Sequence, residues 1–501
     1  MTAVRRFEFG SPLSVLLGEG IRLPCDPLIS AISLDSRLVS SGALFLALRG
    51  NRVDGSAFID AAIKQGAAAV VWEAPADNGV AIRHGVPVVA MAALRWRAGE
   101  IAARFYGEPS RALRVVGITG TNGKTSCSHF LAQALGKERP VGVIGTLGSG
   151  LFGELEESGH TTPDAVSLQA KLALLRDRGV HDVVMEVSSH GLDQGRVHGV
   201  RFDTALFTNL SRDHLDYHPD MAHYGRAKRR LFTLPGLRNA VINADDPFGR
   251  ELLQSLPAGL QVWGYTLEGR RETSLMVSGE ELQLDSAGLR MRVHTPVGGG
   301  WIESPVVGRF NATNLLAVLA SLLMLGLPLE DAIGRLAHLE PVSGRMERFG
   351  GGEAPMVVVD YAHTPDALAQ VLSALQGHGE RLWCVFGCGG DRDRGKRPLM
   401  GRVAARYADR VIVTDDNPRT EDPAAIVADI LRGIPAAARV SVCHQRASAI
   451  EQAILQADER DVVLIAGKGH ERYQLVGGKK LPFSDREVVQ KVLAERGGRN
   501  E

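Results

Sequence analysis

A chain of 501 residues, 45% hydrophobic and 23% charged, is long enough for about three globular domains, each with a sizeable core. Its 57 basic and 57 acidic residues cancel, which excludes a global electrostatic attraction to nucleic acid or to an anionic membrane. Any anionic ligand has to be held by groups that gather locally.

Neither secretion nor membrane insertion is indicated by the sequence. Residues 1–17 lack the long apolar core and the small-residue cleavage site of a signal peptide. The most apolar stretch, 315–329, is interrupted by serine, glycine and proline and is shorter than the roughly 20 residues that cross a membrane, so we expect a buried helix. Five scattered cysteines, with Cys384 and Cys388 as an unaccompanied pair, fit a reducing compartment better than a disulfide framework or a zinc site. We therefore expect a cytoplasmic protein.

The first two regions of the chain differ in their pattern of predicted strands, helices and motifs. Residues 1–111 mix short strands and helices without a nucleotide motif and predict a smaller α/β domain, with strand candidates at 43–48, 67–72 and 87–90. Residues 112–343 alternate apolar runs with helical segments, which predicts a mostly parallel sheet covered on both faces. The strand candidates there are 114–118, 182–187, 204–208 and 240–243.

The central region changes character between residues 258 and 307. Alternating segments such as 282–284 and 291–294 predict antiparallel strands in or beside the domain. A glycine run at 298–300 predicts a turn, and a helix is expected at 311–325.

Residues 344–501 predict a second doubly wound, Rossmann-like α/β domain. Its strand candidates are 356–359, 381–386, 410–414 and 462–466. The last helix opens at Ser484 with Glu487 three residues on, which is the spacing of a capping box.

A phosphate loop is the clearest motif. The apolar strand at 114–118 runs into a glycine-rich segment and then into a helical pattern. Glycines let backbone N–H groups face phosphate oxygens, and the helix N-terminus adds positive potential. Lys124 would bridge the β- and γ-phosphates of ATP, and the Thr125 hydroxyl would ligate Mg²⁺. Ile118 stands where the usual motif has its first glycine, so the loop is a variant. The predicted ATP-binding residues are Gly120, Thr121, Asn122, Gly123, Lys124, Thr125 and Ser126.

Carboxylates and imidazoles follow the loop. Glu186 ends the next apolar strand, where it suits Mg²⁺ binding or the orientation of water, the alternative being a strand end that faces solvent. A later segment carries Asp213, His214, Asp216 and His218. These side chains could ligate a metal or be ordinary loop polar groups. On sequence alone, Lys228 in its basic run reads as a solvated lysine on a helix surface.

Six motifs in order resemble the Mur ligases, which add amino acids to the cell-wall precursor UDP-N-acetylmuramic acid (UDP-MurNAc). They occupy 119–125, 185–190, 208–214, 308–314, 344–347 and 360–363. Each motif is modest alone, but their order and spacing match the family from residue 30 to residue 485. The resemblance implies a UDP-MurNAc-binding domain at 1–111, an ATP-binding P-loop domain at 112–343 and an amino-acid-binding domain at 344–501.

The resemblance also changes the interpretation of Lys228. In similar ligases the lysine at this position is carbamylated by CO₂, and a carbamate offers Mg²⁺ an anionic oxygen where a bare ammonium would repel it. The resemblance therefore implies that Lys228, as N6-carboxylysine, binds metal together with Thr125, Glu186 and His214.

The same resemblance implies that Asn311 reaches the adenine, while Arg345 and Asp360 hold phosphate and ribose. The implied reaction begins when the precursor's carboxylate attacks the γ-phosphate, giving an acyl phosphate and ADP. Lys124, Arg345 and the metal offset the crowded negative charge. The incoming amine then displaces phosphate, and a domain closure should keep water from the acyl phosphate.

Within the family the chain looks closest to the ligases that extend UDP-MurNAc-L-Ala-D-Glu. The implied contacts of the muramoyl dipeptide are His160, Thr161, Thr162, Ser188, Gln194 and Arg196, and those of the uridine side are Leu34, Ser36, Asn51, Arg52 and Val53. Arg196 is a plausible partner for the D-Glu carboxylate. Residues 51 and 52 depart from the family's usual pattern, which places His-Gln or similar there.

The amino-acid site is expected at three strand ends of the third domain. The implied diaminopimelate contacts are Arg392, Asp416, Asn417, Pro418, Arg419, Gly467 and Glu471. Meso-diaminopimelate carries a second carboxylate where lysine has only an ammonium. The Arg419 guanidinium would fork onto that carboxylate and repel a lone ammonium, while Glu471 accepts from the distal ammonium.

Three alternatives remain open at this point. The first is the same reaction with L-lysine as acceptor. The second is a folylpolyglutamate synthase-like ligase, which shares the phosphate loop but lacks the first 110 or so residues as a separate UDP-binding region. The third is a nucleotide-switch protein without catalysis. We expect ATP, Mg²⁺ and small-molecule substrates as ligands, no nucleic acid, no membrane span and a monomer.

Overall fold

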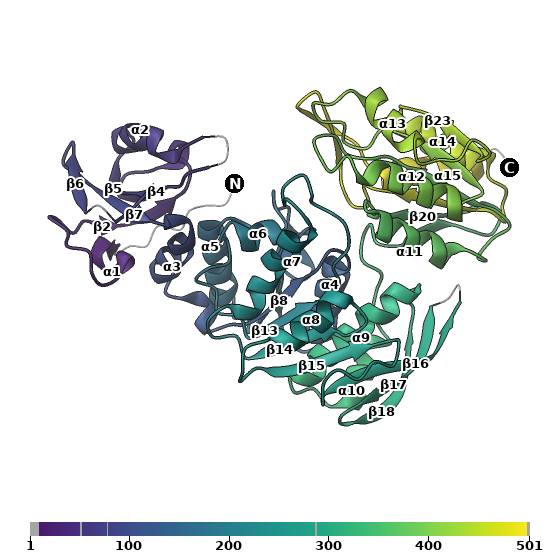
Figure 1. Ribbon diagram of the computed structural model, residues 1–501, viewed down its shortest axis with the longest axis horizontal. Coiled ribbons are helices and arrows are strands. Elements are labelled where there is room, and N and C mark those ends of the chain that lie inside the picture. The colour runs from purple at the N-terminus through teal and green to yellow at the C-terminus, as the bar shows by residue number, and fades with distance from the viewer. Residues whose placement is uncertain (1–9, 51–52, 78, 286–287, 498–501) are drawn as a thin grey trace.

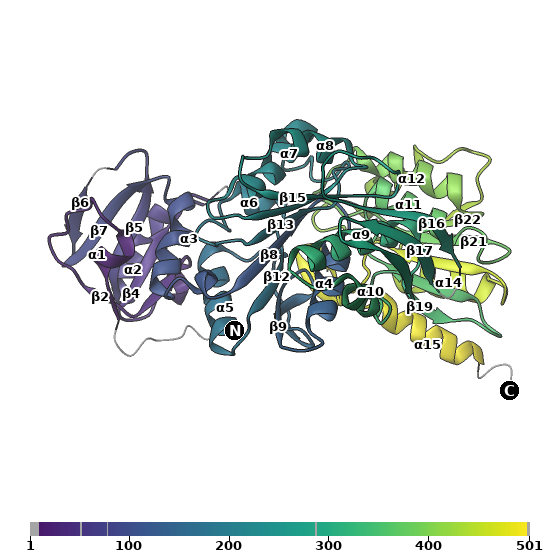
Figure 2. The same cartoon turned by 90° about the horizontal axis from the view of Figure 1, so that it is seen from below.

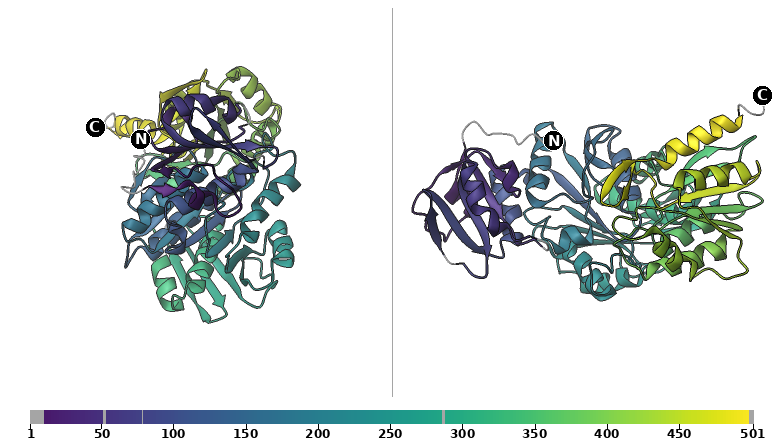
Figure 3. Two further views of the ribbon diagram at one scale, coloured as in Figure 1. Left: turned by 90° about the vertical axis from the view of Figure 1, so that its left-hand side faces the viewer. Right: turned by 90° about the horizontal axis from the view of Figure 1, so that it is seen from above.

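The computed structural model describes residues 10–50, 53–77, 79–285 and 288–497. In that part of the chain three larger sheets follow one another, with the N-terminal sheet at one end and the C-terminal sheet beside the central one (Figures 1 and 2). The right-hand view of Figure 3 shows the same row from above. Among the described residues, no helix has the length and apolarity needed to cross a membrane. The α/β class with three sheets confirms the predicted fold, whereas the boundaries at 111 and 343 stay predictions.

The N-terminal sheet has the strand order β3-β4-β5-β7-β6 and is parallel except for β6. Its strands are β3 (Ala31–Ser33), β4 (Ala43–Ala47), β5 (Ala67–Ala74), β6 (Val80–Arg83) and β7 (Val86–Ala92). The other strands and α-helices described in this region are β1 (Ser11–Pro12), α1 (Leu13–Leu17), β2 (Leu28–Ile29), α2 (Ile59–Lys64) and α3 (Leu94–Phe105). The three predicted strands correspond to β4, β5 and β7.

Helix α3 joins this sheet to the central domain. At Gly99 the helix comes so close to the His198 backbone that an added Cβ would lie 1.8 Å from the His198 carbonyl oxygen. The same helix shares a hydrophobic core with α5 (Ala165–Asp177). Because Gly99 has no side chain, the backbone of α3 can pack against the backbone of the central domain at His198.

The central sheet has eleven strands in the order β11-β10-β9-β12-β8-β13-β14-β15-β16-β17-β18, counted within the described residues. Seven neighbouring strands of this sheet run parallel: β9, β12, β8, β13, β14, β15 and β16. The strands of the whole sheet are β8 (Arg114–Thr119), β9 (Val141–Gly145), β10 (Gly148–Leu151), β11 (Glu154–Glu156), β12 (Asp182–Glu186), β13 (Thr204–Phe207), β14 (Asn239–Asn243), β15 (Gln261–Thr266), β16 (Met276–Leu284), β17 (Leu289–Thr295) and β18 (Gly298–Ser304). The four predicted parallel strands are confirmed.

The helices of the central domain pack on the two faces of this sheet (Figure 1). In addition to α5 they are α4 (Lys124–Leu135), α6 (Ser189–Asp193), α7 (Met221–Arg229), α8 (Pro247–Ser255), α9 (Arg309–Met324) and α10 (Leu329–Leu336). The predicted buried helix is α9, and the apolar stretch around it continues through a turn into α10. The predicted antiparallel segments lie in β16 and β17, and these strands extend the same sheet together with β18, which was not predicted.

The predicted turn at 298–300 is wrong. These glycines begin β18 and pair with Thr295, His294 and Val293 of β17, so that the turn lies before them. An added Cβ at Gly300 would lie 2.6 Å from the Ile333 side chain on α10. Gly300 is therefore explained by the close packing of a helix on a strand.

The C-terminal sheet has the order β19-β20-β24-β21-β22-β23 and is parallel except for β19. Its strands are β19 (Glu347–Gly350), β20 (Met356–Asp360), β21 (Leu382–Phe386), β22 (Arg410–Val413), β23 (Val440–Val442) and β24 (Val462–Ala466). Around it lie α11 (Pro365–Leu375), α12 (Lys396–Tyr407), α13 (Pro423–Leu431), α14 (Arg446–Gln456), α15 (Asp485–Gly497) and the hairpin of β25 (Tyr473–Val476) and β26 (Lys479–Pro482). The cap predicted for the last helix is present, because the Glu487 N–H donates to the Ser484 hydroxyl at 3.3 Å.

A buried ion pair ties α14 to α15. The Arg446 guanidinium donates to both Asp485 carboxylate oxygens at 2.7 Å, and neither side chain is exposed to solvent. We expect Asp485→Ala to lower the free energy of unfolding by about 3–5 kcal/mol, because it leaves a buried guanidinium without its counter-charge. This loss is measured by unfolding the protein in urea, with hydrogen exchange of the β24 amides as the readout. The exposed Arg460–Glu380 pair is the matched control: Glu380→Ala should cost less than about 1 kcal/mol, and equal costs would contradict the assignment.

Candidate functional site

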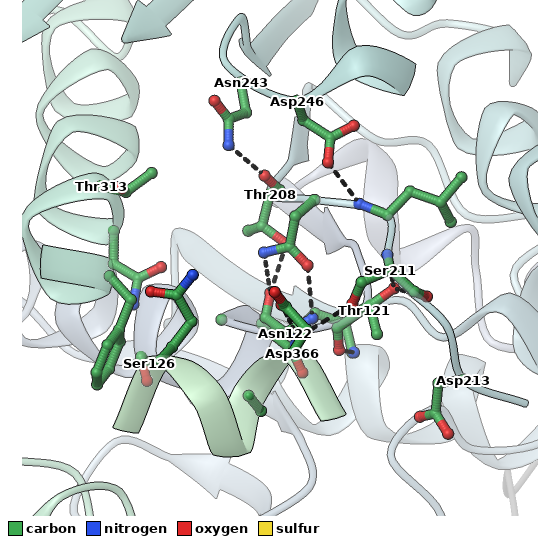
Figure 4. Close-up of a pocket in the computed structure, with 18 of the residues that line it drawn as sticks. Thr121, Asn122, Ser126, Thr208, Ser211, Asp213, Asn243, Asp246, Thr313 and Asp366 are labelled. Carbon is green, nitrogen blue, oxygen red and sulfur yellow. Dashed lines mark hydrogen bonds between the residues drawn. The ribbon is translucent and has the colours of Figure 1, made fainter. Parts of the chain in front are cut away.

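A cavity of about 520 Å³ lies where the central parallel strands end, and the C-terminal domain supplies part of its wall. The central domain contributes the phosphate loop, Glu186 and the loop after β13, while the C-terminal domain contributes Arg345, Asp360, His363 and the start of α11. In Figure 4, Thr313 and Ser126 lie on one side and Asp213 on the other. Open α/β sheets bind ligands at this edge, so the cavity is the candidate active site.

The phosphate loop is held open by hydrogen bonds to the loop after β13. The Thr121 N–H donates to the Asn209 carbonyl at 2.8 Å, and the Asn122 N–H donates to the Asn209 side chain at 2.9 Å. Gly120 has a φ of 151°, and an added Cβ would lie 1.8 Å from the Thr208 hydroxyl, so no other residue fits there. Lys124 begins α4 and donates to the carbonyls of Gly120 and Thr121 at 2.9 and 2.8 Å.

Glu186 lies at the floor of the cavity and is fully buried, so the solvent-facing alternative is wrong. It accepts hydrogen bonds from the Thr125 hydroxyl at 2.9 Å, the Thr146 N–H at 2.8 Å and the Thr146 hydroxyl at 3.0 Å. Two of the predicted metal ligands, Thr125 and Glu186, are therefore in direct contact.

Lys228 is 1% exposed, which overturns its interpretation as a solvated surface lysine. Its Nζ donates to the Gly120 carbonyl at 2.7 Å and lies 4.3 Å from the centre of the Tyr224 ring. Burial and the nearby charge of Lys124 hold the pKa of Lys228 well below its ordinary value, although Asp213 opposes the shift. An uncharged amine is therefore favoured beside the phosphate loop.

His214 has a left-handed backbone with a φ of 55°, which aims its ring at the cavity. Its ring contacts those of His190 and Tyr224, with centroids 4.8 and 6.0 Å away. Burial lowers the pKa of His214 well below its ordinary value, so the ring is neutral and can offer a lone pair. A neutral imidazole is the form that a metal ligand requires.

Asp213 is a junction between the two domains that the sequence did not reveal. Its carboxylate lies 3.3 Å from Lys396 Nζ and 3.4 Å from His363 Nε2, both in the C-terminal domain. A second cross-domain pair joins Arg212 to Asp393 at 2.9 Å. Although burial opposes the shift, Lys396 holds the pKa of Asp213 well below its ordinary value. Ion pairs thus fasten the loop after β13 to the N-terminus of α12.

Arg345 and Asp360 reach the cavity from the C-terminal domain, and their contacts with phosphate and ribose stay a prediction. Arg345 donates to the Thr125 hydroxyl at 3.2 Å and lies over the Tyr361 ring at 4.4 Å. Asp360 accepts from the N–H groups of Met346 and Ala362 at 2.8 and 2.7 Å, and burial raises its pKa. Arg345 and Thr125 therefore place groups of both domains on the phosphate end of the cavity.

Helix α9 carries two asparagines near the cavity, Asn311 and Asn314, and the sequence did not assign a role to Asn314. Asn311, predicted to reach the adenine, accepts from the Asn314 side chain at 3.0 Å and donates to the Val307 carbonyl at 2.9 Å. Of the two, only Asn314 lines the larger cavity. The spacing of three residues along α9 was the available signal, since it places both side chains on one helix face.

The residues predicted to bind the muramoyl dipeptide gather beside Glu186. Thr161 and Ser188 line the cavity, and buried Thr162 donates to the Glu186 carbonyl at 3.0 Å. Arg196 donates to the Thr162 carbonyl at 2.8 Å and contacts the Gln194 side chain. His160 belongs to the same loop, and its pKa is lowered by burial.

The predicted uridine contacts lie apart from this cavity. Leu34 and buried Ser36 follow β3, and Val53 is exposed. Asn51 and Arg52 lie outside the described residues. None of these described side chains lines the cavity.

The residues predicted to bind diaminopimelate converge at the ends of β22 and β24. The Asn417 amide donates to Glu471 at 2.9 Å, and buried Lys468 donates to Glu471 at 2.7 Å and to Asn417 at 3.1 Å. Burial opposes it, but Lys468 keeps the pKa of Asp416 below its ordinary value. Gly467 has a φ of 115° beside Asp416, and its missing Cβ makes room for that carboxylate.

The backbone of Arg419 fixes the position of this residue in the same cluster. Its φ of 55° is left-handed, and its N–H donates to the Leu475 carbonyl of β25 at 2.9 Å. Its guanidinium donates to the Gly390 carbonyl at 2.7 Å, and Pro418 precedes it. Arg392 comes from the neighbouring loop and lies 3.4 Å from Asp216. The structure thus brings the predicted cations and carboxylates of this domain together, and it adds Lys468.

Among the described residues, no group of three or more histidine, cysteine, aspartate or glutamate side chains could hold a metal ion alone. The Thr125 hydroxyl, the Glu186 carboxylate and the His214 ring still supply donors around one cavity. The oxygen donors suit Mg²⁺, which usually takes few protein ligands and completes its shell with phosphate and water. The donor set therefore fits Mg²⁺ bound together with ATP.

Comparisons with known proteins agree along the chain. Family models match the Mur ligase family, catalytic domain at residues 28–106, the Mur ligase middle domain at 118–322 and the Mur ligase, glutamate ligase domain at 344–469. Curated relatives named UDP-N-acetylmuramoyl-L-alanyl-D-glutamate–2,6-diaminopimelate ligase include one from Alkalilimnicola ehrlichii, 51% identical over 94% of this chain and 96% of its own. The one from Pseudomonas aeruginosa is 52% identical over 94% and 96%.

Solved structures give the same result. A structure of a UDP-N-acetylmuramoyl-L-alanyl-D-glutamate–2,6-diaminopimelate ligase has a TM-score of 0.68 and 36% identity, and the match covers 97% of this chain and 100% of that one. Mycobacterium tuberculosis folylpolyglutamate synthase has a TM-score of 0.61 and 22% identity, covering 75% of this chain and 92% of its own. The second match shows a shared fold alone.

Proposed function

The chain belongs to the Mur ligase family, and we propose that it joins meso-diaminopimelate to the D-Glu carboxylate of UDP-MurNAc-L-Ala-D-Glu for peptidoglycan precursor synthesis. It is an ATP-dependent amide-bond ligase that forms ADP and phosphate. The geometric observation that carries this function is the meeting at Thr125, where Glu186 of the central domain and Arg345 of the C-terminal domain both contact one hydroxyl. A cytoplasmic monomer is the form we propose.

The residues present divide the work of phosphoryl transfer. Lys124 and Arg345 place two cations at the phosphate end, where they offset charge as the precursor carboxylate attacks the γ-phosphate. Lys124 would exchange its two loop carbonyls for phosphate oxygens, which are better acceptors for an ammonium. Mg²⁺, when bound, would neutralise phosphate charge and orient it. The amine of the acceptor then displaces phosphate from the acyl carbon.

We assign Lys228 as a carbamate, formed when its amine attacks CO₂ and releases one proton. The proposal is supported by its burial and by its lowered pKa, because only the uncharged amine is nucleophilic. A permanently charged ammonium at this depth would oppose both Lys124 and a cation. The carbamate would provide Mg²⁺ with a second anionic ligand in addition to the Glu186 carboxylate, and the neutral His214 ring would add a nitrogen donor.

The dipeptide and nucleotide contacts stay proposals. The loop of His160, Thr161 and Thr162, with Ser188, Gln194 and Arg196, would hold the muramoyl dipeptide beside Glu186. Asn314 joins Asn311 and Asp360 as a candidate for the adenosine. Leu34, Ser36 and Val53 would contact uridine from the first domain, with Asn51 and Arg52 outside the described residues.

Selection of the amino acid is assigned to the Asp416–Arg419 cluster with Glu471. We expect Arg419→Ala to lower kcat/KM for meso-diaminopimelate by about 100-fold, because a charge-assisted fork to the distal carboxylate is worth roughly 2–3 kcal/mol. Reaction with L-lysine, which lacks that carboxylate, should change less than about fivefold on the same scale. Steady-state ADP release with each amino acid measures both. If Arg419→Ala kept full activity with meso-diaminopimelate, the assigned role of Arg419 in selecting the amino acid would be wrong.

A control separates charge selection from loss of the fold. Arg432 is an exposed arginine of the same domain that also holds a carboxylate, Asp429, at 2.8 Å. Arg432→Ala should leave both activities unchanged. If it lowered diaminopimelate activity as much as Arg419→Ala, the effect would be structural.

The function is tested by the dependence of ADP release on all three substrates. With ATP and Mg²⁺ present, we expect release only when UDP-MurNAc-L-Ala-D-Glu and meso-diaminopimelate are both added. Release with folate and glutamate instead would favour the folylpolyglutamate synthase alternative, which shares only the fold. Nucleotide binding without any release would favour a nucleotide switch.

A further inference from the structure

A second cavity, of about 490 Å³, lies behind the phosphate-loop helix. It is bounded by α4, the connection between β18 and α9, the chain segment that joins the central and C-terminal domains, and Arg486 near the start of α15. Figure 2 shows α4, β19 and α15 along the same lower side of the molecule. The residues assigned above to the dipeptide and to diaminopimelate do not line it.

The charged lining of this cavity is predominantly positive. It has three arginines, Arg345, Arg348 and Arg486, and one carboxylate, Glu347. Glu347 is already engaged, because it accepts from Arg486 at 2.7 Å and from the Gly344 N–H at 2.8 Å. Within the described residues, the Arg486 Nε–H is buried without a hydrogen-bond partner. An anion bound here would meet guanidinium groups of the lining, and the Arg486 Nε–H is a buried donor that it would satisfy.

The second cavity adjoins the candidate active site. Ser126 and Arg345 line both cavities, so they form a shared wall. Nearby, Asn314 of the first cavity donates to Asn311 of the second at 3.0 Å. Arg345 also contacts Thr125 at the phosphate end of the first cavity. An oxyanion leaving that end could therefore keep a guanidinium contact while it passes from one cavity to the other.

We propose that the second cavity is an oxyanion site that takes up the inorganic phosphate released by the ligase reaction. This proposal rests on the proposed function for the identity of the anion, since the reaction makes one phosphate for each amide bond. Guanidinium groups suit a tetrahedral oxyanion because their N–H groups fork onto two oxygens. The volume leaves room for phosphate together with water that bridges it to the wall. Binding there would move the product away from Lys124 before the next ATP enters.

The test is equilibrium dialysis of radiolabelled inorganic phosphate against the full chain. A saturating non-hydrolysable ATP analogue with Mg²⁺ fills the first cavity, so that the phosphate measured is bound only at other sites. We expect Arg486→Gln to weaken phosphate binding about tenfold, because it removes one charge-assisted donor. Arg486→Lys keeps the charge and should recover most of the affinity. Arg460→Gln is the matched control, since it also loses one carboxylate partner, and it should bind phosphate as the unaltered chain does.

Three results would overturn the proposal: no phosphate binding by the unaltered chain at millimolar concentration, equal affinity in Arg486→Gln, or an equal loss in Arg460→Gln. Product inhibition gives the functional counterpart. Phosphate should inhibit ADP release less in Arg486→Gln, while the KM for ATP stays the same. Dialysis needs no turnover, so a chain that binds phosphate at Arg486 but forms no amide would refute the ligase function and leave the anion site standing.

Discussion

Replacing Lys228 by alanine should lower kcat by about 1,000-fold, a loss of roughly 4 kcal/mol in transition-state stabilisation. Lys228 is 1% exposed, and its Nζ lies 2.7 Å from the Gly120 carbonyl of the phosphate loop. Removing it would delete the proposed carbamate and with it an anionic oxygen for Mg²⁺. Steady-state ADP release with all three substrates measures the effect.

A control variant and a rescue experiment show whether the loss of activity is due to the missing carbamate. Arg226→Ala removes an exposed cation from the same helix and should leave kcat unchanged. Added formate or acetate should restore part of the activity of Lys228→Ala, because a small carboxylate can occupy the space of the missing carbamate. An unmodified amine in a metal-loaded crystal structure, or activity of Lys228→Ala within threefold of the unaltered enzyme, would count against the carbamate.

Replacing Lys124 by alanine should lower kcat/KM for ATP by about 1,000-fold, or roughly 4 kcal/mol. The side chain is held over its own loop by the carbonyls of Gly120 and Thr121, so it is already positioned at the phosphate end of the cavity. The loss should be largest in kcat, because charge on the transferring phosphoryl group is greatest in the transition state.

The matched control for this substitution is Lys137→Ala, since Lys137 is an exposed lysine just beyond the end of the same helix. Its kinetics should be unchanged. Circular dichroism and urea unfolding of both variants confirm that the fold is intact. If Lys124→Ala raised only the KM for ATP and kept kcat, the lysine would bind substrate without stabilising the transition state, and its assigned role would be wrong.

The features that could be predicted from the sequence are those set by residues close together in the chain. The strand, loop and helix around Lys124 are contiguous, so their order in the chain is their order in space. The parallel strands β8, β12, β13 and β14 were predicted because buried strands are continuous apolar runs. Glu186 was assigned from its place at the end of an apolar strand and Arg345 through the family motifs, and both line the cavity.

Tertiary packing explains what the sequence could not predict. Lys228 stands in a run of basic residues, which gives no sign that this one side chain turns inward. A usable signal was the four-residue spacing from Tyr224, which places both side chains on one helix face. The contacts of Asp213 with Lys396 and His363 span more than 140 residues of chain and depend on how two domains meet.

Buried charge in the C-terminal domain was missed for a similar reason. Lys468 reads as an ordinary loop lysine between two glycines, yet it is fully buried and holds Glu471 and Asn417 in place. The hairpin of β25 and β26 was also missed, because its strands are short and lack both a buried face and an apolar alternation. Only the folded hairpin shows that the Arg419 backbone is fixed by Leu475.

The choice of acceptor is tested most directly by competition in one reaction. The full chain is incubated with ATP, Mg²⁺, UDP-MurNAc-L-Ala-D-Glu and equal concentrations of meso-diaminopimelate and L-lysine, and the products are identified by mass spectrometry. The arrangement of Arg419, Asn417 and Glu471 predicts that the diaminopimelate tripeptide predominates by at least about 100-fold. A predominant lysine product, or no tripeptide product at all, would contradict the account.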